Sequence, residues 1–357
     1  SNFFEIKILA DLSYKGDLPL AISFITFTAI AILVDVKTKK YEEKINFYSL
    51  SEFLIYFPQL IAGPILRAKE LIPLLKSKIV FTNANVKFGI LLFMIGFVKK
   101  IFFADSISNF IDPIFEKENL TASQDYIKGF LLFPLQIYFD FSGYVDMALG
   151  VSKILSIDLP INFNRPYLSS SLTEFWRNWH ITLSKWFRDY VYIPLGGSRY
   201  GNKKLFGNLF LTMSIAGLWH GASINFILWG SINGIFLFLE KKMSKHFNFN
   251  KLIKISLTCF LVFNLWIIFR INDLNFLLIF YSNLYQNFFT IIEIENLILL
   301  ALVITAVFSQ KFDNYKYIEN ISKKLNFLIL IPIFIIVLIT GLAIKAGSSE
   351  KFIYFDF

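Results

Sequence analysis

Residues 205–239 read LFGNLFLTMSIAGLWHGASINFILWGSINGIFLFL, and these 35 consecutive residues include no Asp, Glu, Lys or Arg. One straight helix needs about 20 apolar residues to cross the hydrocarbon core of a bilayer. The run is too long for one straight span, so it predicts two helices or one sharply bent helix. Gly217 and Gly221 are the expected break points. A run of this kind indicates an integral membrane protein.

Apolar segments near the length of a membrane span also occur along the rest of the 357-residue chain. Hydrophobic residues make up 55% of the chain and charged residues 17%, against roughly a quarter in soluble domains. Gly63-Pro64 predicts a bent or re-entrant segment, and Lys99-Lys100 interrupt another segment near its end. We therefore expect an all-α, multi-spanning protein with about eight to ten membrane segments. Besides the charge-free run, these segments cover residues 18–34, 54–66, 86–103, 126–155, 253–269, 276–285, 296–308 and 327–344.

The net charge of +9 is scattered over short polar connections. That distribution is typical of the basic flanks of membrane helices, whereas a nucleic-acid-binding protein carries a clustered basic patch. Cys259 is the one cysteine, which excludes an internal disulfide and a cysteine-based zinc site. The sequence contains no Walker loop, GxGxxG, HExxH or GxSxG motif and no internal repeat. We expect one membrane domain over residues 1–357, in contact with the lipid bilayer, with no bound metal and no nucleic-acid partner.

A polar and aromatic island at residues 162–199 separates the apolar segments: NFNRPYLSSSLTEFWRNWHITLSKWFRDYVYIPLGGSR. Its Ser171-x-x-Glu174 pattern is a capping box, which predicts the start of a helix, and Pro194 ends the element. Four residues then share one helical face at i, i+4, i+7 and i+11: Trp176, His180, Leu183 and Phe187. The pattern predicts an amphipathic helix. It either lies at the membrane interface or forms a re-entrant wall of a substrate cavity.

Ionisable residues inside apolar segments are costly and mark candidate functional sites. His220 lies within the charge-free run, and histidine is the side chain best suited to proton transfer near neutral pH. The alternative is a neutral histidine that bridges two helices. Asp140 and Asp146 are six residues apart and do not share a helical face, so we expect a separate, structural partner for each, backbone or an arginine of the polar island. His246 is expected to be a solvated surface residue.

Residues 139–150 (FDFSGYVDMALG), the polar island and residues 217–230 (GLWHGASINFILWG) resemble the membrane-bound O-acyltransferase family. The branch that they resemble holds alginate and peptidoglycan O-acetyltransferases and the teichoic-acid D-alanyl transferase. Residues 18–27, 56–67 and 352–357 extend the resemblance through nearly the whole chain. The resemblance implies a multi-helix funnel in the bacterial cytoplasmic (inner) membrane. It also implies that His220 corresponds to the essential histidine of the family and His180 to its second histidine.

The resemblance further implies transfer of an acyl group, above all acetyl, from a cytoplasmic thioester to a hydroxyl outside. The expected co-substrate is acetyl-CoA or an acyl carrier thioester, and no cofactor is bound. The acceptor is a polysaccharide or a relay protein, and an extracytoplasmic transferase is an expected partner. Arg165, Arg177 and Arg188 are candidate phosphate ligands of the donor, or else a basic interfacial collar. With His220 and His180 as catalytic residues, we expect substrate contacts from Trp176, Arg177, Trp179, Trp219, Asn164, Arg165 and Asp140.

Two departures from the family pattern and two rival functions remain. Relatives carry further helices before the LPLAISF segment at residue 18, so the chain is expected to lack N-terminal helices of full-length relatives. Asn233 stands where relatives often have a histidine.

A transporter of an acyl or sugar-linked compound would also explain the spans and their ionisable residues. A non-catalytic scaffold for an extracytoplasmic transferase is the second rival.

Overall fold

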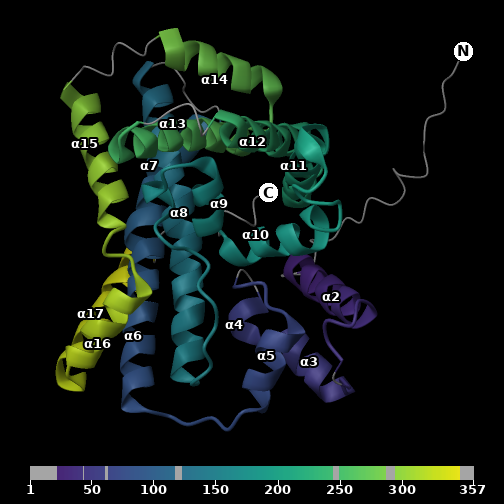
Figure 1. The fold of residues 1–357 in the computed structure, drawn as a ribbon. Coiled ribbons are helices and arrows are strands. Elements are labelled where there is room, and N and C mark those ends of the chain that lie inside the picture. Colours follow the sequence, from purple (N-terminus) through teal and green to yellow (C-terminus); the bar gives the residue numbers. More distant parts are fainter. Residues whose placement is uncertain are drawn as a thin grey trace, which may run out of the picture.

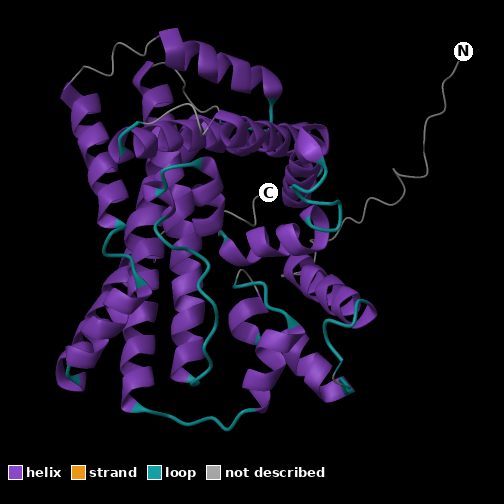
Figure 2. Ribbon diagram, viewed as in Figure 1, coloured by secondary structure: helices purple, strands orange, loops and turns teal. Residues whose placement is uncertain are grey.

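The computed structural model describes residues 22–42, 44–60, 63–116, 123–243, 249–286 and 294–345, and every regular element in these ranges is helical (Figure 2). The α-helices are α2 (Ile22–Lys37), α3 (Phe47–Ile55), α4 (Phe57–Leu60), α5 (Ala68–Lys76), α6 (Asn83–Val98), α7 (Asp105–Phe115), α8 (Ser123–Ile154), α9 (Leu172–Asn178), α10 (Ile181–Phe187), α11 (Gly201–His220), α12 (Ile224–Met243), α13 (Lys251–Arg270), α14 (Leu274–Gln286), α15 (Ile294–Ser309), α16 (Tyr315–Lys324) and α17 (Phe327–Lys345). The all-α prediction is confirmed for these ranges. Residues 18–21, His246 and residues 352–357 lie outside them.

The centre of the fold is the antiparallel pair α6 and α8, which run side by side along the molecule (Figure 1). Two glycines on each helix allow this contact. A Cβ added at Gly89 would lie 2.6 Å from the carbonyl oxygen of Gly150, and one at Gly96 would lie 2.4 Å from that of Gly143. Small residues let helix backbones approach in this way, as is common between membrane helices.

The pair Lys99-Lys100, predicted to interrupt a span, does not end the helix. A π-helical segment, Lys99–Ala104, carries the chain from α6 into α7. The Lys99 ammonium lies 2.6 Å from carboxylate oxygens of both Asp146 and Asp313, and Lys100 pairs with Asp140 and, at 2.7 Å, with Asp105. The prediction of a separate partner for Asp140 and for Asp146 is confirmed. Their ion partners are lysines of this π-helical segment, not arginines of the polar island.

The charge-free run forms the two helices that its length predicts, α11 and α12, and the chain breaks between them at Gly221. Gly217, the other expected break point, lies inside α11. A Cβ there would lie 2.0 Å from the carbonyl oxygen of Phe226, so this glycine allows α11 and α12 to touch. Gly230 does the same from α12, because its Cβ would lie 2.1 Å from the carbonyl oxygen of Met213.

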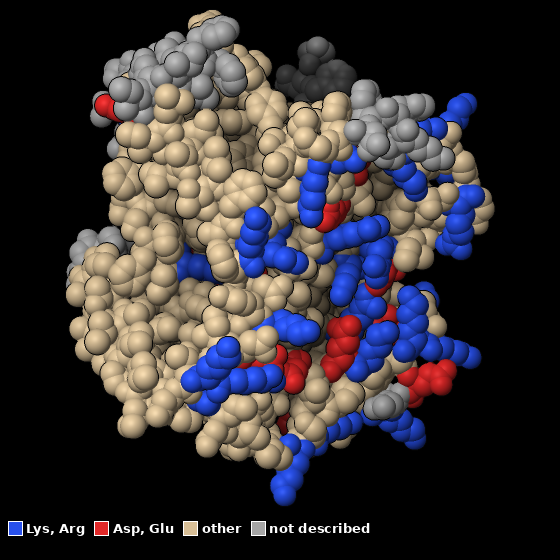
Figure 3. Space-filling view, turned by 60° about the vertical axis from the view of Figure 1, so that its left-hand side comes forward, with Lys and Arg blue, Asp and Glu red and all other residues tan. Residues whose placement is uncertain are grey.

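Two helices of the described ranges, α13 and α17, are long and apolar enough to cross a membrane, and α15 is a shorter apolar helix. Side chains of α17 such as Leu328 (81% exposed) and Ile336 (62%) face outward, as lipid-contacting residues do. Charged side chains gather over part of the face in Figure 3 and leave a wide region without charge. The larger number of spans stays a prediction.

Candidate functional site

The polar island begins its helix where the capping pattern predicts. The Ser171 side chain accepts a hydrogen bond from the backbone N–H of Glu174, at 3.0 Å, and α9 follows. The Glu174 carboxylate accepts from the backbone and hydroxyl of Ser170, both at 2.7 Å. A second carboxylate, Glu240 at the end of α12, accepts from the N–H groups of Leu172 and Thr173. Sequence reasoning missed Glu240, because a cap from a distant helix leaves no local pattern.

The prediction of one continuous amphipathic helix is wrong. α9 ends at Asn178 and α10 begins at Ile181, with His180 between them in the left-handed region (φ 41°, ψ 57°). The preceding loop crosses the break: the N–H of Asn164 donates to the carbonyl of Asn178, and the N–H of Ile181 donates to that of Asn162. The loop supplies partners for backbone groups at the break, which favours two short helices over one. The face shared by Trp176 and Leu183 is therefore not continuous.

The break places His180 in the interior, where its side chain is 1% exposed. Its Nδ1 lies 3.2 Å from Oδ1 of Asn162, which also accepts from the N–H and hydroxyl of Thr182 at 3.0 and 2.9 Å. An amide oxygen can only accept, so Nδ1 is the protonated nitrogen of the neutral ring. Nε2 then carries the lone pair, buried and without a hydrogen-bond partner among the described residues. Asn162 is a positioning residue that sequence reasoning missed.

His220, the last residue of α11, lines a cavity of about 620 Å³. Its ring packs against Trp219, Phe269 and Trp229, with centroid distances of 4.7, 4.9 and 5.4 Å. His180 is not among the residues that line this cavity. The other lining residues are Thr173, Trp176, Arg177, Leu183, Ser184, Phe187, Arg188, Tyr192, Ser198, Leu209, Thr212, Met213, Ala216, Trp229, Leu237, Glu240 and Lys241.

Asn233, the departure from the family pattern expected from the sequence, contacts one wall of this cavity. The indole N–H of Trp176 donates to Oδ1 of Asn233 at 3.1 Å, and the Asn233 amide donates to the carbonyl of Trp229 at 2.8 Å. Asn233 is fully buried. Its side chain therefore fixes the indole of Trp176 against α12.

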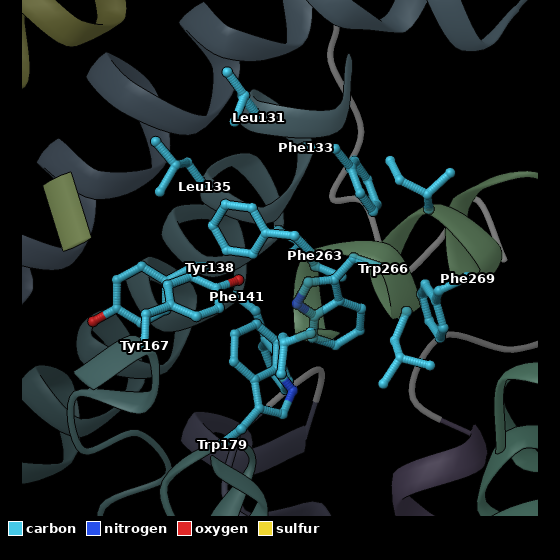
Figure 4. Close-up of a cluster of buried hydrophobic side chains, with 14 of the residues drawn as sticks. Leu131, Phe133, Leu135, Tyr138, Phe141, Tyr167, Trp179, Phe263, Trp266 and Phe269 are labelled. Carbon is cyan, nitrogen blue, oxygen red and sulfur yellow. The ribbon is translucent and has the colours of Figure 1, made fainter. Parts of the chain in front are cut away.

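Five of the seven predicted substrate contacts are not in the lining of the cavity with His220, and three of these five are packed or paired elsewhere. Trp179 is 1% exposed and packs in an aromatic core, 4.8 Å from the ring of Trp266 (Figure 4). Trp219 packs on Phe27, and its indole N–H is buried without an acceptor among the described residues. Asp140 is in the ion pair with Lys100. Their roles toward substrate stay predictions.

The three arginines predicted to bind phosphate are divided between two cavities. Arg177 and Arg188 line the cavity with His220, whereas Arg165 and Asn164 line a second cavity of about 420 Å³. Arg188 pairs with Asp189 at 2.7 Å, and Asp189 also binds Arg67. Burial would raise the pKa of the Asp189 carboxyl, but hydrogen bonds from these two arginines outweigh burial and hold that pKa below its ordinary value. Within the described ranges, no three His, Cys, Asp or Glu side chains are grouped to hold a metal ion.

Comparison of the sequence with known proteins places the chain in a family. The family model of MBOAT, the membrane-bound O-acyltransferase family, matches residues 33–280. The chain is 42% identical over 263 residues to the probable alginate O-acetylase AlgI of Pseudomonas syringae pv. tomato, covering 72% of this chain and 50% of that protein. It is 39% identical over 289 residues to the peptidoglycan O-acetyltransferase of Helicobacter pylori, covering 72% and 55%.

A more distant relative is the teichoic acid D-alanyltransferase of Bacillus subtilis, 28% identical over 245 residues, covering 64% of this chain and 61% of that protein. The chain spans about half the length of the O-acetylating relatives that it matches. The matched region contains the polar island, α11 and α12, and with them both histidines. The chain belongs to the membrane-bound O-acyltransferase family.

Proposed function

We propose that this protein is a membrane-bound O-acetyltransferase, with one membrane domain that spans the bacterial cytoplasmic membrane several times. It moves an acetyl group from a cytoplasmic thioester, acetyl-CoA or an acyl carrier, to a hydroxyl of a cell-wall or extracellular polysaccharide or of a relay protein. The observation that carries the proposal is His220 in the wall of a cavity of about 620 Å³, in a chain of this family. The names of the two O-acetylating relatives support acetyl as the acyl group.

The reaction needs a base at the acceptor hydroxyl. Neutral His220 takes the hydroxyl proton while the oxygen attacks the thioester carbonyl and forms a tetrahedral intermediate. The intermediate then collapses, the C–S bond breaks, and the leaving thiolate takes the proton from His220. General base catalysis of this kind accelerates a reaction by about 10²- to 10⁴-fold. The aromatic rings of Trp229 and Phe269 on His220 keep water from competing for the thioester.

The tetrahedral oxyanion needs a hydrogen-bond donor. The buried indole N–H of Trp219 has no acceptor among the described residues, which supports Trp219 in this role. Neutral His180 cannot donate through Nε2, because its proton is on Nδ1 and bound to Asn162. The lone pair on Nε2 suits His180 to accept a hydrogen bond rather than to donate one. Arg177 and Arg188, which line the same cavity as His220, bind phosphate of the donor arm. If the acceptor is a relay protein, an extracytoplasmic transferase would be the partner that takes part in the next transfer of the acetyl group.

The test is acetyl transfer from labelled acetyl-CoA by the purified protein, compared with His220→Ala and with His246→Ala. The first variant should lose transfer while its thermal unfolding midpoint stays near that of the native protein. The second replaces another histidine of the chain and should retain transfer. Undiminished transfer by His220→Ala would contradict the proposed mechanism. If the folded native protein transfers acetyl from neither acetyl-CoA nor an acyl carrier, the scaffold function would replace the proposed one.

A further inference from the structure

The second cavity, of about 420 Å³, lies on a different face of α9 from the cavity with His220. Thr173, Trp176 and Arg177 line the cavity with His220, whereas Glu174 and Asn178 line the second one. Positions 174 and 178 are one helical turn apart and share a face that positions 173 and 177 do not. The two cavities are therefore separate sites with α9 as the wall between them.

Three cations from distant parts of the chain line this second cavity: Arg165 in the loop before α9, Lys251 at the start of α13, and Lys311 just after α15. None of the three has a carboxylate partner within 4.0 Å among the described residues. The one carboxylate in the lining, Glu174, is bound to Ser170. Three cations without an anionic partner around one cavity are suited to an anion.

Buried contacts hold these three cations together. The N–H of Tyr167 donates to Oε1 of Gln310 at 3.0 Å, and the thiol of Cys259 donates to the carbonyl of Tyr167 at 3.1 Å. These bonds attach the loop of Arg165 to the end of α15, next to Lys311, and to the helix that Lys251 begins. Arg165 itself has a left-handed backbone (φ 53°, ψ 54°) directly before Pro166. Such a conformation is strained and persists only where the surrounding structure imposes it.

A membrane span formed by α13 would have this cavity at its headgroup end, because Lys251 is in the lining and begins the helix. Lys251 is the first residue of α13, one of the two helices long and apolar enough to cross a membrane. The next residue, Leu252, is 60% exposed. The apolar part of the lining comes from Leu168, Leu252, Ile255 and Phe308. A ligand with a negative head and an apolar chain matches this combination of cationic and apolar groups.

We propose that the cavity between α9, α13 and the end of α15 binds the phosphate headgroup of an anionic phospholipid. Arg165, Lys251 and Lys311 bind the phosphate, and the acyl chain leaves over Leu252 and Ile255. The same phosphate chemistry occurs in coenzyme A, but the apolar lining and the position at the start of α13 favour the lipid. The proposal does not depend on transferase activity, so a failure of either proposal leaves the other in place.

The experiment measures binding of short-chain phosphatidylglycerol and short-chain phosphatidylcholine to the purified protein in detergent by native mass spectrometry. The native protein should bind phosphatidylglycerol more tightly than phosphatidylcholine. The triple variant Arg165→Gln/Lys251→Gln/Lys311→Gln should bind phosphatidylglycerol about 10- to 100-fold more weakly, since each basic group near a bilayer surface contributes to anionic lipid binding. The matched control, Lys316→Gln/Lys323→Gln/Lys324→Gln, removes the same charge from the exposed surface of α16 and should bind like the native protein.

Three outcomes would overturn the proposal. The first is equal binding of the two lipids by the native protein, and the second is an unchanged affinity in the triple variant. The third is displacement of phosphatidylglycerol by coenzyme A together with loss of coenzyme A binding in the triple variant, which would assign the cavity to the donor. If the triple variant fails to fold, Lys311→Gln alone is the test: it changes one exposed side chain and should weaken phosphatidylglycerol binding severalfold.

Discussion

At the scale of single residues, the proton position on His180 depends on one amide oxygen. Oδ1 of Asn162 accepts from His180 and twice from Thr182, and the hydroxyl of Thr182 accepts in turn from the N–H of Ile65. This network ties the loop before α9 to α10 and to the segment after α4. It sets which ring nitrogen of His180 is free, and so what His180 can do in the reaction.

Replacement of Asn162 by alanine should lower acetyl transfer by at least about tenfold, because the tautomer and orientation of His180 are no longer held. Loss of the shared acceptor should also destabilise the fold by about 1–3 kcal/mol. Asn162→Asp keeps an acceptor oxygen for the three donors, now in a carboxylate, and should recover most of the transfer. Rate and thermal midpoint are measured for both variants. If Asn162→Asp is as stable as the native protein yet as slow as Asn162→Ala, the positioning role is wrong.

At the scale of elements, the site is built from helices that end beside one another. α9 ends just before His180 and α11 ends at His220, while Glu240 from the end of α12 caps the start of α9. The contact between α11 and α12 through Gly217 and Gly230 brings the wall residue Trp229 against His220. A change in the distance between these two helices would therefore alter the cavity.

Gly217→Ala tests that contact, and Gly207→Ala on the same helix is its control. The new methyl group at 217 would lie 2.0 Å from a backbone oxygen, so the helices must separate, at a cost of about 1–3 kcal/mol. At 207 nothing lies within 4 Å, and alanine should stabilise the helix by about 0.5–1 kcal/mol. Thermal midpoints should move in opposite directions, and transfer should fall in Gly217→Ala only. Equal midpoints for the two variants would refute the close contact.

At the scale of the whole molecule, a buried layer of charge joins helices that are far apart in sequence. Lys99 connects α6 and its π-helical continuation to Asp146 of α8 and to Asp313 in the turn between α15 and α16. Tyr138 also donates to Asp313. Removal of one member of a buried ion pair leaves the opposite charge without compensation.

We expect Lys99→Met to destabilise the protein by about 3–5 kcal/mol, because the buried Asp146 and the half-buried Asp313 lose their cation. Lys128→Met is the control: its contact with Asp125 is 3.9 Å long and exposed, so its loss should cost less than about 1 kcal/mol. The measurement is the thermal unfolding midpoint of each purified variant in the same detergent. Similar midpoints for the two variants would show that the buried layer does not hold the bundle together.

The sequence by itself determined the features that rest on neighbouring residues. Thirty-five residues without charge predicted two helices or one sharply bent helix, because bilayer thickness limits the length of a span, and Gly221 was one of the two expected break points. Ser171 determined the start of α9, because a cap acts within one turn. The motifs around His180 and His220 were sufficient to indicate the family that the comparisons confirm.

Only the tertiary structure decided the features whose partners lie far along the chain. The break at His180 depends on a loop that crosses it, and the pairing of Lys99 depends on Asp146 and Asp313, 47 and 214 residues away. The tertiary structure also puts Arg165 and Arg177 in different cavities, although the sequence had suggested both as phosphate ligands of one donor. Helical periodicity describes one element at a time, whereas hydrogen bonds and ion pairs between elements form only once the chain has packed.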